Sequence, residues 1–183
     1  MKVAVPRMTL EEWERLPNDG NRYELIDGEL YVTPAPRTRH QIVQMRLSGA
    51  LHAFAEAHEL GTVMAAPTDV ALEPASQTRV EPDILFVTRE REHIIEEKLI
   101  NGPPDLVVEI LSESTHWVDL QDKRDPYRRS GVQEYWVVDP DQNHLLVYRF
   151  AEGPEPRKLS SNEKLATPLL PGLELDLQRI FRK

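Results

Sequence analysis

Apolar residues follow two periodicities along this chain: a three- to four-residue repeat that predicts helices, and a two-residue repeat or short run that predicts strands. The longest helical repeat begins at Thr38 or Arg39, runs to Leu60 and is followed by Gly61, a residue that commonly ends helices. Thr9, followed by acidic residues, predicts the start of a short helix. Helices are therefore predicted at residues 10–16, 38–60, 119–130 and 175–181, and residues 88–100 form a charged connector with some helical character.

Strand signals fall between these helices. Asp27-Gly28 is a tight-turn pair, so residues 22–26 and 29–32 are predicted to form a hairpin. Pairing across that turn predicts one apolar face made of Tyr23, Leu25, Leu30 and Val32, with Glu24, Ile26, Glu29 and Tyr31 on the other. Further strands are predicted at residues 62–65, 69–72, 80–87, 106–111, 134–138 and 145–150, the last two as a hairpin joined by residues 139–143.

Helices and strands that alternate in this way indicate an α/β fold, with a central mixed β-sheet flanked by helices. No internal repeat or linker divides the 183 residues, a length that one domain with a buried core can fill. We therefore expect a single domain over residues 1–183, with its core at about 9–150 and C-terminal strands and a helix at 157–181.

The composition narrows the classes of protein. Cysteine is absent, which excludes disulfides, thiolate zinc sites and cysteine nucleophiles. No apolar stretch approaches the about 18 residues of a membrane span, and the N-terminus lacks a signal-peptide pattern, so a cytoplasmic protein without membrane contact is expected. The formal net charge of −9 argues against nucleic-acid binding through bulk charge alone, although an acidic metal site contributes to such a charge.

A carboxylate interrupts one of the predicted buried strands. Glu109 stands between two apolar residues on each side, where an unpaired charge is costly, and the preceding apolar strand carries Asp83 directly after a proline. If the strands are neighbours, both carboxylates converge at one end of a sheet, where they share a proton or bind a cation. Hard oxygen ligands favour Mg²⁺, or Mn²⁺ as a substitute. The alternatives are a strand-end charge, a salt bridge, and a carboxylate that caps backbone amides.

Lys123 is a third residue with candidate chemistry. It lies three residues after Leu120 and four before Tyr127, the apolar pair of its predicted helix, so it points inward or to the rim. A lysine there could orient an attacking water beside a metal and stabilise charge on a phosphate. The alternative is a lysine whose aliphatic stem lies on the core while its ammonium reaches solvent.

Several longer motifs accompany these residues. Pro82-Asp83, the later Glu109-x-Leu111 and Lys123 in the following helix resemble the PD-(D/E)xK nuclease superfamily. Over about residues 9–181 the chain also resembles the restriction-endonuclease-like Uma-two family of bacterial proteins. The stretches that carry this resemblance are Tyr23-Glu-Leu-Ile-Asp-Gly-Glu29, Val80-Glu-Pro-Asp83, Val108-Glu-Ile-Leu-Ser112 with Ser114-Thr115, and Lys123-x3-Tyr127-x3-Gly131-Val132-x-Glu134-Tyr-Trp136-x2-Asp139-Pro140.

The resemblance implies a sheet-centred nuclease core in which Asp83, Glu109 and the carbonyl oxygen of Ile110 hold the metal ion. The superfamily motif places its lysine where this chain has Leu111. The resemblance therefore implies that Lys123 supplies the ammonium from the next helix.

Other polar residues are weaker candidates. Glu24 matches the acidic position of the family's early hairpin and is implied as a further carboxylate of the site; an exposed hairpin glutamate is the alternative. Phosphate or DNA contacts are expected from a basic cluster and a serine, although ordinary helix starts and surfaces carry the same residues. These candidates are His40, Arg39, Arg124, Arg128 and Ser112.

The sequence thus predicts a Mg²⁺-dependent endonuclease that hydrolyses phosphodiester bonds of DNA, with Asp83, Glu109, Lys123 and Glu24 as its catalytic residues. One alternative is a non-catalytic module on the same fold that binds nucleic acid or protein. Another is a metal hydrolase for a small phosphorylated substrate. A homodimer would suit an enzyme that cuts both strands of DNA, although no heptad repeat or apolar patch in the sequence indicates one.

Overall fold

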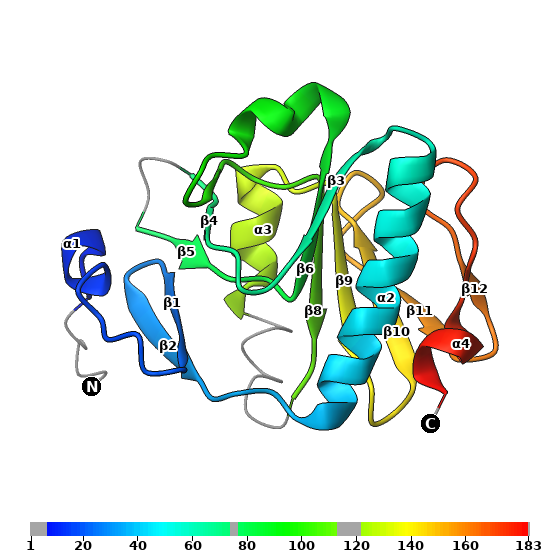
Figure 1. The fold of residues 1–183 in the computed structure, drawn as a ribbon, viewed down its shortest axis with the longest axis horizontal. Coiled ribbons are helices and arrows are strands. Elements are labelled where there is room, and N and C mark those ends of the chain that lie inside the picture. The colour runs from blue at the N-terminus through cyan, green and yellow to red at the C-terminus, as the bar shows by residue number, and fades with distance from the viewer. Residues whose placement is uncertain (1–6, 74–76, 113–121, 183) are drawn as a thin grey trace.

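The computed structural model of the protein describes residues 7–73, 77–112 and 122–182. At its centre lies a six-stranded sheet (Figure 1). Its strands, in spatial order, are β11 (Arg157–Ser160), β10 (His144–Arg149), β9 (Glu134–Asp139), β8 (Leu106–Ile110), β6 (Ile84–Thr88) and β3 (Gly61–Ala65). The sheet is mixed, because β8 runs parallel to β9 and antiparallel to β6.

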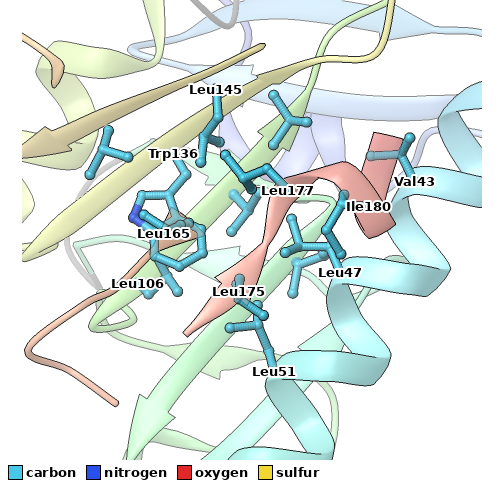
Figure 2. Packing of buried hydrophobic residues seen from close by; sticks show 14 of the residues in the cluster. Val43, Leu47, Leu51, Leu106, Trp136, Leu145, Leu165, Leu175, Leu177 and Ile180 are labelled. Atoms are coloured by element: carbon cyan, nitrogen blue, oxygen red, sulfur yellow. The ribbon is translucent and has the colours of Figure 1, made fainter. Parts of the chain in front are cut away.

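One face of the central sheet is covered by α2 (Thr38–Ala57) and by the C-terminal segment with β12 (Lys164–Leu165), β13 (Leu175–Asp176) and α4 (Leu177–Phe181). Figure 2 shows Val43 and Leu47 of α2 near Ile180 of α4, with Trp136 of β9 in the same hydrophobic cluster. Apolar residues at helical spacing along α2 make this contact. The packing fixes α2 along the sheet, with its first turn beside the residue that precedes β6.

The opposite face is covered by α3 (Arg124–Ser130) and by a second sheet that the sequence did not predict (Figure 1). Its strands, in spatial order, are β2 (Glu29–Thr33), β1 (Arg22–Ile26), β5 (Arg79–Val80), β4 (Val70–Ala71) and β7 (Ile100–Asn101). A second hydrophobic cluster joins Leu85 and Val107 of the central sheet to Ile26 of β1 and Tyr127 of α3. Because both faces are buried, the middle strands of the central sheet are apolar runs.

Most helices and strands lie where the sequence predicts them. Helix α1 (Leu10–Trp13) follows Thr9, whose hydroxyl accepts a hydrogen bond from the amide of Glu12. The hairpins β1–β2 and β9–β10 are present, and the connector contains a 3₁₀ helix at Arg89–Ile94. The predicted α/β fold with a central mixed sheet is confirmed. No helix in the described part of the chain has the length and hydropathy that a membrane crossing needs.

The single strand predicted at residues 80–87 is wrong. Two strands of different sheets occupy this segment, since β5 ends at Val80 and β6 begins at Ile84. Pro82 lies in the break, where its missing N–H disturbs no sheet ladder. Asp83 therefore sits in the connection between the two sheets.

The first hairpin has the predicted register and faces, but the burial of its residues does not follow the apolar character of the faces. Tyr23 pairs with Val32 and Leu25 pairs with Leu30, as expected. Val32 is nevertheless 52% exposed, whereas Glu24 is buried on the other face of the hairpin. That face packs against the central sheet, so the hairpin carries an acidic side chain into the interior.

The helix predicted at residues 119–130 is shorter at its start. Helix α3 begins at Arg124, and Lys123 is its N-cap residue; residues 119–121 lie outside the described residues. Gly131 ends the helix with a φ of 101°, a left-handed conformation that glycine adopts readily. The C-terminal helix also begins late, at Leu177, because the two residues before it form β13.

Replacement of Gly61 by alanine is expected to lower the free energy of unfolding by about 2 kcal/mol or more. Gly61 has a φ of +141°, and a Cβ atom there would lie 2.2 Å from the carbonyl oxygen of Val87. Urea unfolding measures the effect. Gly49→Ala is the matched control: it lies within α2, and a Cβ atom added there would have no neighbouring atom within 4 Å. It is expected to gain about 1 kcal/mol, and equal stability of the two variants would contradict this account.

Candidate active site

Two buried carboxylates meet at one end of the central sheet. The antiparallel register of β6 and β8 ends with Ile84 opposite Val108, and Asp83 and Glu109 are the next residues along the two segments. The amide of Ile110, next to Glu109, donates to Oδ2 of Asp83 at 2.7 Å and joins these segments. Only 2% of Asp83 and 1% of Glu109 is exposed. The strand register thus brings together the two carboxylates that the sequence singled out.

Asp83 is held by donors from three elements. Its Oδ1 accepts from Arg22 Nη2 of β1 at 2.9 Å, and its Oδ2 lies 3.1 Å from Nε2 of His40 on α2. The amide of Ile110 also donates to Oδ2, at 2.7 Å, and Nε2 of Gln44 donates to the backbone carbonyl of Asp83 at 2.8 Å. Burial alone would raise the pKa of Asp83, but the hydrogen bond from His40, the charge of Arg22 and the Ile110 amide outweigh burial and lower this pKa.

The ammonium of Lys123 lies between Glu24 and Glu109. Its Nζ is 2.8 Å from Oε2 of Glu24 and 3.0 Å from Oε1 of Glu109, and all three residues are buried. Glu24 also accepts a hydrogen bond from the amide of Glu81, at 2.9 Å. The structure thus differs from two alternatives left open by the sequence, an exposed hairpin glutamate and a lysine that reaches solvent. Leu111, at the motif's usual lysine position, packs in the second hydrophobic cluster.

Sequence reasoning missed Tyr127. Its hydroxyl donates to Oε1 of Glu109 at 2.7 Å, the same oxygen that Lys123 contacts. Burial and then the charges of Glu109 and Glu24 raise the pKa of Tyr127 well above its ordinary value, so it stays a donor. A signal was available, since Tyr127 follows Lys123 by one helical turn and a buried tyrosine needs a partner for its hydroxyl.

Arg22 was also missed. Besides Asp83, its guanidinium contacts Oε1 of Glu81 at 2.9 Å through Nε. Burial would lower the pKa of Arg22, but the negative charges of Asp83, Glu109 and Glu24 raise it, so the guanidinium remains charged. The alternation of side chains along a strand could have identified Arg22, because it precedes Glu24 by two residues and shares its face of β1.

Four carboxylates and two cationic side chains form this cluster among the described residues. Arg22 pairs with Glu81 and Asp83, and Lys123 pairs with Glu24 and Glu109. Carboxylate and carbonyl oxygens are the ligands that Mg²⁺ takes in proteins. The donor set therefore fits Mg²⁺ in atom type.

In the structure, the carboxylates of this cluster are arranged around the cationic side chains of Arg22 and Lys123. Within residues 7–73, 77–112 and 122–182, no three His, Cys, Asp or Glu side chains lie together as a metal-binding group. The ammonium of Lys123 instead occupies the space between two of the carboxylates. A metal ion held by Glu109 would thus share that carboxylate with Lys123.

Two of the weaker candidates lie on the first turn of α2. His40 is buried against Asp83, and because a carboxylate accepts, its Nε2 carries the proton. Its Nδ1 has no hydrogen-bond partner among the described residues. Arg39 reaches a different place: its guanidinium donates to the backbone carbonyls of Phe181 and Arg182 at the end of α4. The structure thus brings His40, and not the guanidinium of Arg39, to the carboxylates.

The remaining candidates surround the end of β8 and helix α3. Ser112 lies two residues beyond the end of β8, and Ser114 and Thr115 lie outside the described residues. Arg124 contacts Asp125 at 3.3 Å, and Arg128 is exposed in the last turn of α3. Phosphate contacts by these side chains stay predictions.

Substitution of Asp83 by asparagine is expected to change the acid stability of the protein. The lowered pKa of Asp83 means that its ionised form stabilises the fold above about pH 4, and that this contribution is lost as the pH falls through the folded-state pKa. Asp83→Asn should therefore be less stable by about 3 kcal/mol at neutral pH, and the difference from the wild type should shrink in acid. Thermal melts over this pH range measure both curves; parallel curves would contradict the expectation.

Known proteins share this fold. A crystal structure of a protein from Anabaena variabilis, described as a "putative nuclease belonging to DUF820", matches the chain with a TM-score of 0.80 at 21% sequence identity. The match covers 95% of this chain and 97% of that chain, and at this identity it establishes the fold. A comparison with curated proteins finds no match. The sequence matches the Uma2 family, described as "Putative restriction endonuclease", over residues 10–178, a span that contains the whole carboxylate cluster, and the chain belongs to this family.

Proposed function

We propose that the protein is a Mg²⁺-dependent endonuclease that hydrolyses phosphodiester bonds of DNA. The observation that carries the proposal is the buried contact of Lys123 with Glu109 and Glu24, beside the carboxylate of Asp83. Buried charges of this kind are rare outside functional sites, because each must be compensated by precisely placed partners. Membership in the Uma2 family, described as "Putative restriction endonuclease", supports the same chemistry.

In this proposal Asp83, Glu109 and the carbonyl oxygen of Ile110 hold the metal ion. When bound, Mg²⁺ would polarise the phosphate and lower the pKa of water. The surrounding residues keep the carboxylates in place: His40 and Arg22 donate to Asp83, and Tyr127 donates to Glu109. The contacts of His40 and Arg22 also lower the pKa of Asp83.

Lys123 is the residue that we expect to act on the reactants. Its ammonium would orient water for in-line attack on phosphorus and would stabilise the negative charge that develops on the phosphoryl oxygens as the bond to the leaving 3′ oxygen breaks. Glu24 holds the ammonium at 2.8 Å and so fixes its direction. Phosphate contacts from Arg124, Arg128 and Ser112 belong to the same proposal.

One observation favours a second candidate, a non-catalytic module that binds nucleic acid or protein. Asp83 accepts hydrogen bonds from Arg22, His40 and Ile110, and Lys123 contacts both glutamates, so each of these carboxylates has a partner from the chain itself. Such a network could serve the fold alone. This candidate predicts binding without turnover.

A cleavage assay separates the two candidates. Plasmid and oligonucleotide DNA are incubated with the protein in Mg²⁺, in Mn²⁺ and in EDTA, and calorimetry measures binding of each metal ion. Cleavage that depends on the metal supports the nuclease. Binding of DNA with no cleavage in Mg²⁺ or in Mn²⁺ would contradict the nuclease proposal and favour the binding module.

A further inference from the structure

A cleft of about 470 Å³ lies between α2, the start of β1 and two connecting segments, residues 33–36 and 65–67. Its size is that of a pocket for a small molecule or a single residue of a polymer. One side is a continuous face of α2, because Gln41, Gln44, Met45 and Ser48 recur at three- and four-residue spacing. One wall of the cleft is therefore a regular helix face, and the connecting segments form the other side.

The floor of the cleft adjoins the candidate active site. Three lining residues touch Asp83 directly or through one partner: Arg22 donates to its Oδ1, Gln44 donates to its carbonyl, and Glu81 pairs with Arg22. A phosphate attacked beside Asp83 therefore has this cleft next to it. One of the two nucleosides attached to that phosphate can extend into it.

The walls have the chemistry of a base-binding pocket. Amide side chains line it, from Asn18 and Asn21 on one side and Gln41 on the other, and Arg22 and Glu81 cancel each other's charge. Asparagine and glutamine present a donor and an acceptor together, which matches the edge of a base. Apolar surface is also at hand, since the exposed side chain of Met45 and the rings of Pro34, Pro36 and Pro67 line the same cleft.

We propose that this cleft binds one unpaired nucleotide beside the scissile phosphate, so that the substrate is single-stranded DNA or DNA with an extruded base. This inference rests on the proposed nuclease function. A base within a duplex has its Watson–Crick edge occupied and its faces stacked, and it cannot enter a pocket of this volume. The net charge of −9 agrees, because a protein that reads an unpaired base through amides and apolar contacts needs less phosphate neutralisation than one that grips a duplex.

Fluorescence anisotropy in EDTA tests the assignment without turnover. The probes are a short labelled single-stranded oligonucleotide and the blunt duplex of the same sequence. The wild-type protein is expected to bind the single strand about tenfold more tightly than the duplex. The double variant Gln41→Ala/Met45→Ala is expected to lose this preference, because it removes an amide and the apolar wall while both residues are exposed in the folded protein.

Ile42→Ala/His52→Ala is the matched control, since both residues are exposed on α2 and neither lines the cleft. It should keep the preference, and thermal melts of both variants should equal that of the wild type. Equal binding of single strand and duplex, or an unchanged preference in Gln41→Ala/Met45→Ala, would overturn the assignment. Failure of the proposed nuclease function shows differently, as absence of cleavage in Mg²⁺, which an assay in EDTA does not register.

Discussion

Replacement of Glu109 by glutamine is expected to reduce metal-dependent DNA cleavage by about a thousandfold or more while the protein remains folded. Glutamine keeps the size of the side chain and an oxygen that can accept from Tyr127, but it removes the negative charge that the proposed metal ion and Lys123 both need. Cleavage of a labelled oligonucleotide at saturating Mg²⁺ measures the loss. Retained cleavage activity in Glu109→Gln would contradict the proposed function.

Glu134→Gln is the matched control. Glu134 is as buried as Glu109, lies on the neighbouring strand β9 and bonds to Arg149, Trp136 and Thr167. Its side chain belongs to the opposite face of the sheet, where Trp136 packs with α2 and α4. Glu134→Gln should lose about as much stability as Glu109→Gln and keep the cleavage rate of the wild type. A fall in activity caused only by a weakened core would therefore appear in both variants.

Lys123→Met is expected to lower the free energy of unfolding by about 3–5 kcal/mol and to abolish cleavage. Methionine keeps an apolar stem of similar length, but Glu24 and Glu109 then face each other in a buried space without the ammonium between them. Mg²⁺ should restore part of the lost stability, because a divalent cation that binds those carboxylates binds only the folded state. Urea unfolding with and without Mg²⁺ measures both effects.

The exposed pair of Lys164 and Glu174 supplies the comparison. Its ammonium and carboxylate lie 2.7 Å apart, but both side chains are about two-thirds exposed. Lys164→Met should leave the melting temperature unchanged, because water already screens this pair. If Lys123→Met were no more harmful than Lys164→Met, the buried contact would not hold the cluster together.

The pattern of the sequence was sufficient for most of the fold. The helical spacing of apolar residues predicted α2. The Asp27-Gly28 turn predicted the first hairpin, and the turn at residues 139–143 predicted the second. The second sheet as a whole escaped prediction, although its hairpin and a strand at residues 69–72 were predicted, because β5 and β7 have two residues each and carry no periodic signal. The two faces of the first hairpin were predicted correctly, but the burial of Glu24 depends on packing against the central sheet, which the hairpin's own residues do not reveal.

The site was partly predictable for a related reason. Asp83 and Glu109 break apolar runs, and such breaks are visible in a sequence. Arg22 and Tyr127 do not stand out in the same way. Arg22 begins a strand, where a charged residue is common, and Tyr127 lies in a helix, where a tyrosine ring often packs on the core. Only the packing of β1 and α3 against the same face of the central sheet turns them into partners of the two carboxylates.

The division of the site between the two sheets has a consequence for a newly made chain. Arg22 and Glu24 come from the second sheet, Asp83 from the connection between the sheets, and Glu109 from the central sheet. Lys123 joins them only when α3 has docked. A growing chain therefore cannot assemble the charged cluster before α3 has left the ribosome, and under the proposed function nuclease activity would first appear when that helix has docked.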